Sequence, residues 1–220
     1  MKFLLSLLAV IVGGVCATNA AELSDTISVD RVFIDCQSKA LDVLQRSTRL
    51  DMTDYAKAGS EYKAVNEFYG VSTITSYSDS CIDINLTQVS KAQIFTLPTS
   101  KGGVAALIYT IEADSVSESQ IEFYSGNLAP LKLTNYFKPP VLNDFIRPAY
   151  RKDKQAVNNV NTTIPFIAVS YVYNPADETL LATLSVKGLV TEEEYRQVSD
   201  CLCTSLSYRW TGNKWELVNP

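Results

Sequence analysis

The sequence contains no histidine among its 220 residues. Without an imidazole, the chain cannot build a serine–histidine or cysteine–histidine nucleophile pair, a histidine-ligated zinc site or a histidine pH switch. The sequence also lacks the signatures GxxxxGK[ST], GxGxxG and GxSxG, which cradle phosphates or present a nucleophilic serine. We therefore expect no cofactor, and any catalysis would have to rely on carboxylates, hydroxyls or lysines.

Basic residues are outnumbered by acidic ones. The chain has 19 Lys and Arg against 24 Asp and Glu, which gives a formal net charge of −5. Because nucleic-acid-binding proteins present an excess of positive charge, we expect no nucleic-acid partner. Hydrophobic residues make up 46% of the chain and charged residues 20%, an ordinary globular composition that leaves room for one or two packed domains.

Long apolar runs are missing as well. No stretch reaches the roughly 18 apolar residues of a membrane-spanning helix, so we expect no transmembrane span. A shorter run from Phe3 to Val12, apolar except for Ser6, follows Lys2 and precedes small residues at 17–21. This is the pattern of a secretory signal peptide. We predict that residues 1–20 are that signal and that the mature protein is exported to the periplasm or cell envelope.

The five cysteines fall into two groups. Cys16 lies within the predicted signal, and lipid attachment there is disfavoured because Val15 is larger than the small residue usual before an acylated cysteine. An even number remains for a compartment that permits disulfides: Cys36, Cys81, Cys201 and Cys203. Their possible disulfides would join Cys36 or Cys81 to the CxC pair or to each other, since a bridge within CxC is strained. Buried free thiols are the alternative, and the spacing departs from that of a four-thiolate zinc site, so we expect no metal.

Hydrophobic periodicity divides the mature chain. Apolar residues at helical spacing predict one amphipathic helix over 28–46 and a second helix, or a broken pair, over 52–68. From Val71 the period changes to two, which predicts a series of short strands as far as 126. The proline-rich and polar residues 138–164 indicate one long connection.

The sequence pattern of residues 165–220 predicts a hairpin, a helix and a second hairpin. A capping box at Thr191 and Glu194 indicates where that helix begins. The predicted fold class is α+β: mainly an antiparallel sheet meander with an N-terminal helix pair and one C-terminal helix before a closing aromatic hairpin. We expect residues 21–137 to form the front helices and the β-meander, and residues 138–164 to connect this part to the next. Residues 165–220 should form the hairpin, helix and second hairpin and pack with the preceding part as one unit.

The closing hairpin contains the two tryptophans of the chain. A four-residue turn separates Trp210 from Trp215, so a simple hairpin places the two side by side on one face, in line with Tyr208. These three residues form a candidate binding surface, on which a sugar or peptide could stack. The alternative, which the alternation with polar residues favours, is that the same face packs into the core.

Carboxylates offer the remaining route to catalysis. A two-carboxylate hydrolase would require two of Asp51, Asp54, Asp79 and Asp83 to converge on one cavity at a suitable separation. Nothing in their spacing shows such convergence, and Asp54 is explained more simply as a cap or first-turn residue of the helix predicted near Met52.

Five segments, in this order, carry a family resemblance: RLDMTDYAKAG, AQIFTLP, GGVAALIYTIEA, IEFYSGNLAPL and SYRWTGNKWEL. Together they resemble an uncharacterised family of exported Bacteroidales proteins, a domain of unknown function. The resemblance covers most of the mature chain and implies a bacterial cell-envelope location, without implying an activity or any catalytic residue.

The sequence thus indicates an exported envelope protein of unknown function. We expect a non-enzymatic binding or adaptor module whose sheet presents a surface to a protein, peptide or glycan of the envelope. A carboxylate-dependent hydrolase acting on envelope glycans or peptides is the alternative, and a structural subunit of a larger assembly is a third.

Overall fold

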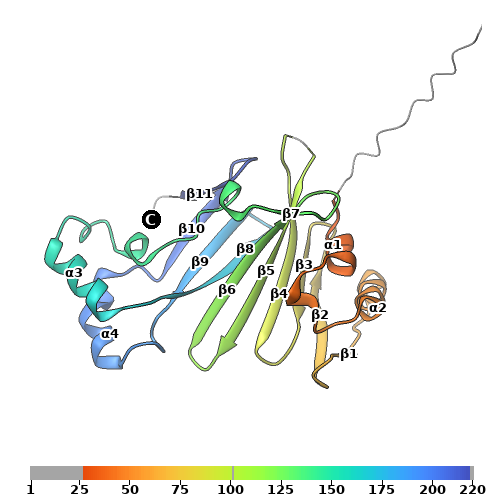
Figure 1. The fold of residues 1–220 in the computed structure, drawn as a ribbon, viewed down its shortest axis with the longest axis horizontal. Coiled ribbons are helices and arrows are strands. Elements are labelled where there is room, and N and C mark those ends of the chain that lie inside the picture. The colour runs from red at the N-terminus through yellow and green to blue at the C-terminus, as the bar shows by residue number, and fades with distance from the viewer. Residues whose placement is uncertain (1–26, 101, 219–220) are drawn as a thin grey trace, which may run out of the picture.

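The computed structural model describes residues 27–100 and 102–218, which form two antiparallel sheets flanked by helices (Figure 1). The first sheet has seven strands in chain order: β1 (Ala64–Val65), β2 (Val71–Tyr77), β3 (Cys81–Asn85), β4 (Ser90–Leu97), β5 (Val104–Ala113), β6 (Val116–Tyr124) and β7 (Pro130–Leu131). The second sheet has four, in the order β11 (Trp215–Val218), β10 (Ser205–Trp210), β9 (Thr179–Ser185) and β8 (Ala168–Asn174). The α+β class with its antiparallel meander is confirmed.

The front of the chain is broken into shorter helices than its pattern predicts. α1 (Val29–Asp35) ends after two turns, and α2 (Arg46–Lys57) follows a short 3₁₀ turn, so the prediction of one helix over 28–46 is wrong. The cause is the buried Arg49, whose guanidinium donates to the carbonyls of Phe33 and Cys36 at 2.9 and 3.2 Å. These carbonyls lie at the end of α1, where a helix needs outside partners.

The second helix begins and ends earlier than the predicted 52–68. The polar segment RSTRLD forms its first half, and Met52 and Thr53 are buried. Asp54 therefore lies inside the helix and is neither a cap nor a first-turn residue. Gly59, with a φ of 70°, follows the end of the helix, in the left-handed conformation common at that position. The chain then enters β1.

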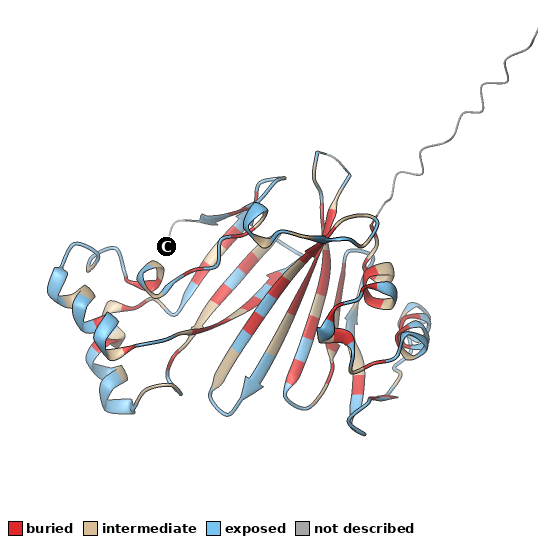
Figure 2. Ribbon diagram, viewed as in Figure 1, coloured by how far each residue is buried: buried red, intermediate tan, exposed pale blue. Residues whose placement is uncertain are grey.

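The first sheet lies between two apolar layers (Figures 1 and 2). One face packs against α1 and α2, where Ile82, Ile94 and Leu107 are buried with helix residues such as Phe33. The other face contributes to a larger cluster that also contains residues of the second sheet. Figure 2 shows buried residues along the middle of β4 and β5, which need apolar contacts on both sides.

The second sheet follows the predicted hairpins. β8 and β9 are joined by a turn that begins at Asn174, and β10 and β11 are joined by the predicted turn at 211–214. Trp210 and Trp215 are direct cross-strand partners, with ring centroids 5.5 Å apart, as the turn length predicted. The aromatic hairpin and its register are therefore confirmed.

The segment between the sheets contains a helix that the sequence did not predict. α3 (Lys154–Thr163) starts at Asp153, whose carboxylate accepts hydrogen bonds from two backbone N–H groups of the first turn. Its polar run of Asn and Thr has low helix propensity, which hid the apolar spacing of Val157, Val160 and Ile164. Burial of Val160 and Ile164 outweighs that weak propensity.

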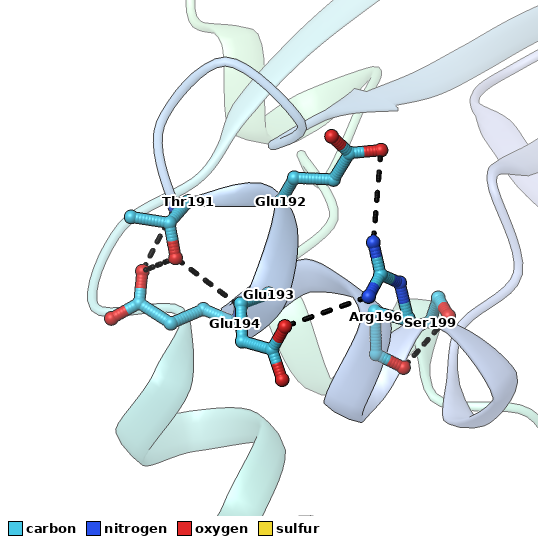
Figure 3. A network of polar contacts seen from close by, with 6 residues as sticks. All are labelled: Thr191, Glu192, Glu193, Glu194, Arg196 and Ser199. Carbon is cyan, nitrogen blue, oxygen red and sulfur yellow. Dashed lines mark hydrogen bonds and ion pairs between the residues drawn. The ribbon is translucent and has the colours of Figure 1, made fainter.

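α4 (Glu192–Val198) begins at the predicted capping box (Figure 3). The Thr191 hydroxyl accepts from the Glu194 N–H, and the Glu194 carboxylate accepts from the Thr191 N–H at 2.8 Å. These bonds to Thr191 lower the pKa of Glu194. The α-helix ends at Val198, and a 3₁₀ turn over Ser199–Cys201 follows it.

Among the helices of the described residues, none has the length and apolar character needed to cross a membrane. The predicted signal peptide, with Cys16, lies outside the described residues.

Candidate functional site

The face of the first sheet that meets the second sheet changes from apolar to polar along its strands. On β5, Ala106 belongs to the core between the sheets, whereas Thr110 and Glu112 line an open groove. On the neighbouring β4, Phe95 is buried and Lys91 is exposed. Since β4 and β5 are antiparallel, their polar ends lie together.

The edge strand of the second sheet, β8, lies across this face at the change in polarity. The Tyr173 N–H donates to Oε1 of Gln93 at 2.7 Å, and the Tyr173 carbonyl accepts from Nε2 of the same side chain at 2.9 Å. The Tyr171 N–H donates to the Ser119 hydroxyl at 3.0 Å. The ring of Tyr173 also stacks on Phe95, with centroids 4.0 Å apart. Side chains of the first sheet thus occupy backbone groups that an open edge strand would offer to another strand.

Beside β8, the uncovered polar part of the face forms a hollow of about 540 Å³, which we call the polar groove. Strands β2 to β6 supply its floor and β8 supplies one wall. Its volume lies in the range typical of small-molecule sites. Its polar lining residues are Thr75, Asp83, Asn85, Lys91, Gln93, Thr110, Glu112, Ser117, Ser170 and Asn174.

Asp83 is the half-buried carboxylate of the polar groove. Burial raises its pKa above the usual value for aspartate, and the Gln93 amide offsets part of this rise by hydrogen bonding. Burial, followed by the nearby Asp83 charge, also raises the pKa of Cys81 to about 12. A ligand that donates hydrogen bonds to the Asp83 carboxylate would favour its ionised form.

The second carboxylate of the groove, Glu112, is neutralised by Lys91, whose Nζ lies 2.8 Å from Oε2. Strand register aligns Asp83 with Gln93 and Gln93 with Ile108, so Glu112 lies two strands away and four residues further along. At ordinary strand spacings this puts the two Cα atoms about 16 Å apart. Paired-carboxylate hydrolysis uses carboxyl groups roughly 5–9.5 Å apart. The wide Cα separation, together with the ion pair that holds Glu112 on Lys91, makes Asp83 and Glu112 unsuited to that mechanism.

The four aspartates considered from the sequence do not converge. Asp51 and Asp54 are exposed on α2, which covers the opposite face of the sheet, and Asp79 is exposed in the turn between β2 and β3. Of the four, only Asp83 lines the polar groove. Sequence reasoning also missed Gln93, although its place in SKAQIFTL, on the same face as Phe95, signals a polar group within a buried strand.

The predicted aromatic surface lies in the core. Trp210, Trp215 and Tyr208 are only 8, 5 and 6% exposed and belong to the cluster between the sheets. Trp210 donates from Nε1 to the Pro98 carbonyl at 2.7 Å, while the buried Nε1 of Trp215 has no partner among the described residues. The three rings are therefore packed in the core, and Tyr208 and Trp215 also line a hollow of about 450 Å³.

No disulfide is present among the described residues: the four cysteines for which a bridge was considered are free thiols, which matches the alternative of unbridged cysteines. The sheet itself separates them: Cys36 is buried on the helix side and Cys81 on the side of the second sheet. The remaining two flank Leu202, and the Cys203 thiol donates to the Phe145 carbonyl at 3.0 Å. No group of three or more His, Cys, Asp or Glu side chains is arranged for a metal within 27–100 and 102–218.

A family model described as a protein of unknown function, DUF3256, matches residues 23–215. The chain belongs to the DUF3256 family. This confirms the expected membership of an uncharacterised family. No curated protein matches the DUF3256 chain. A solved structure described as a domain of an uncharacterized protein from Porphyromonas gingivalis W83 is similar, with a TM-score of 0.73 and 20% identity over 86% of the DUF3256 chain and 98% of its own. Porphyromonas is a Bacteroidales genus, and at this identity the likeness shows the shared fold.

Proposed function

We propose that this DUF3256 protein is an exported, non-enzymatic binding module of the cell envelope, and that its polar groove holds a neutral, hydroxyl-rich ligand such as an envelope glycan. The observation that carries the proposal is the uncovered polar end of the sheet face. On this uncovered part of the face, strand residues that do not pack in the core present amide, hydroxyl and carboxylate groups to one hollow of about 540 Å³. Concave sites with convergent polar groups are the usual places for ligands.

The charges of the groove favour a neutral ligand. Lys91 and Glu112 neutralise each other, which leaves the half-buried Asp83 as the unpaired formal charge among the lining residues. Asp83 and Asn85 lie two positions apart on β3, so their side chains point to the same side about 7 Å apart. Such planar polar groups can accept from and donate to neighbouring sugar hydroxyls.

The groove suits a glycan better than a peptide strand. A peptide that adds to a sheet needs an open backbone edge, and β8 is the edge beside the groove. Gln93 and Ser119 already occupy the backbone groups of Tyr173 and Tyr171 on that edge. Recognition is then left to side chains, which is how a hydroxyl-rich ligand would be bound. Paired-carboxylate hydrolysis is not proposed, because Asp83 and Glu112 are too far apart.

Binding measured by NMR on the protein can test the proposal. The purified protein would be titrated with short neutral oligosaccharides and, separately, with short neutral peptides, while backbone amide shifts are followed by NMR. We expect saturable shifts for groove residues with an oligosaccharide, and their loss in Asn85→Leu. Asn159→Leu, on the exposed side of α3, is the matched control and should bind normally.

Two outcomes would count against the proposal. If peptides shift the same residues and no oligosaccharide does, the ligand of the groove is a peptide and the proposed glycan is wrong. Shifts that survive Asn85→Leu, or that map away from the groove, would remove the groove as the binding site.

A further inference from the structure

The turn between β1 and β2 holds two aromatic side chains in solvent. Phe68 is 75% exposed and Tyr69 is 94% exposed, and we call this pair the aromatic tip. Large aromatic side chains contribute most to stability when they are buried, so a neighbouring exposed pair indicates a contact surface. Tyr69 also has a φ of 58°, a left-handed conformation that is unfavourable for a side chain of its size.

A buried asparagine fixes this turn in place. The Asn66 side chain accepts from the N–H groups of Phe68 and Gly70 at 3.0 and 2.9 Å. Its amide donates to the Leu86 carbonyl at 2.9 Å and to the Ser72 hydroxyl at 3.2 Å. The aromatic tip is therefore preorganised, which lowers the entropy that binding would cost.

The aromatic tip itself lines one side of a hollow of about 570 Å³. Thr87, Gln88 and Val89 of the turn between β3 and β4 line it, together with Tyr109 and Ile111 of β5. None of its lining residues carries a formal charge. A surface that binds lipid would place lysine or arginine around the apolar residues, and the hollow has neither.

The apolar area of this surface is close to what a dimer needs. The aromatic tip, with the half-exposed Val89 and Ile111, exposes an area of the order of 500 Å². A standard stable complex buries about 800 Å² on each partner, about 60% of it apolar, so full burial of this area would supply the apolar part of one such interface. Since the lining is uncharged, contact through the hollow itself buries no like charges between two copies with a net charge of −5.

We propose that the aromatic tip and the adjacent hollow form a self-complementary surface by which two copies of this chain associate. The aromatic tip is exposed to solvent at the edge of the hollow that it helps to line. A two-fold axis between them places each tip in the hollow of the other copy, which gives a closed dimer with two identical contacts.

Sedimentation equilibrium of the purified protein tests this directly. We expect the mass of two chains at concentrations of tens of micromolar. Phe68→Ser combined with Tyr69→Asn should give the mass of one chain, because asparagine tolerates the left-handed backbone while the aromatic contact is lost. Ile111→Glu, in the hollow, should dissociate the dimer from the other side of the same contact.

The matched control is Phe166→Ser, which removes an aromatic ring that is 64% exposed on another part of the molecule. This variant should keep the mass of two chains, and circular dichroism should show that all variants stay folded. A wild-type mass of one chain at every concentration overturns the proposal. A dimer that survives both the tip and the hollow variants overturns it too. Flotation of a monomeric wild type with phospholipid vesicles, lost on changing the tip, would assign the surface to lipid instead.

Discussion

The two tryptophans offer a direct test of how hydrogen bonding shapes the core. Trp210 and Trp215 are similarly buried cross-strand partners, so replacing either by phenylalanine removes a similar amount of apolar contact. They differ in one bond. Nε1 of Trp210 donates to the Pro98 carbonyl, whereas Nε1 of Trp215 has no acceptor among the described residues.

The magnitude follows from that difference. Trp210→Phe loses a hydrogen bond worth about 1 kcal/mol. We expect no larger loss, because Pro98 is an exposed residue and water can take the place of the indole at its carbonyl. Trp215→Phe removes a buried unpaired donor, whose desolvation costs about 1–3 kcal/mol in the native protein. Trp210→Phe should therefore lower the free energy of unfolding by about 2–4 kcal/mol more than Trp215→Phe does.

Urea unfolding followed by circular dichroism would measure both variants, with unchanged m values showing that the same surface is exposed on unfolding. Equal losses, or a larger loss for Trp215→Phe, would refute the reasoning. Such a result would mean that the Trp215 N–H is satisfied by the aromatic rings around it or by water.

Two further predictions concern the polar groove. Asp83 has a raised folded pKa, so above its ordinary value of 3.8 the native state binds more protons than the unfolded chain, and stability falls as pH rises through this window. Asp83→Asn should remove that fall and keep the melting temperature higher near neutral pH; parallel pH profiles of the two proteins would contradict this. Gln93→Leu removes two hydrogen bonds to β8 and should cost about 2 kcal/mol, with faster hydrogen exchange at the Tyr173 amide. The exposed Gln120→Leu should change neither quantity, and equal effects of the two substitutions would show that the contacts to β8 contribute little.

The strands could be predicted because the residue pattern that specifies them lies within each strand and its adjoining turn. The alternation in SKAQIFTL and the turn length between Trp210 and Trp215 fix which residues share a face, and the structure agrees. The helices at the front were less predictable, because α1 is ended by Arg49, a residue of another helix. α3 was missed for a related reason: burial of Val160 overrides a polar sequence of low propensity.

The candidate site could not be predicted from local sequence patterns. The groove exists because β8 stops covering the sheet at Gln93, and the contact between Gln93 and Tyr173 joins residues 80 positions apart. The alternation indicates that Asp83 and Gln93 can share a face, but not where the second sheet ends on it. The four cysteines show the same limit, since only the fold reveals that the sheet stands between Cys36 and Cys81.

The side-chain bonds that hold β8 also have a consequence for how the chain folds. Most neighbouring strands within each sheet are joined by short turns, whose contacts need only short loops to close, whereas β9 and β10 are joined through α4. The bonds from Gln93 to Tyr173 and from Trp210 to Pro98 span 80 and 112 positions, so they carry a larger entropic cost. The two sheets are therefore expected to form separately and dock last. Until they dock, the backbone of β8 is open, and the nascent protein is most vulnerable to aggregation at that stage.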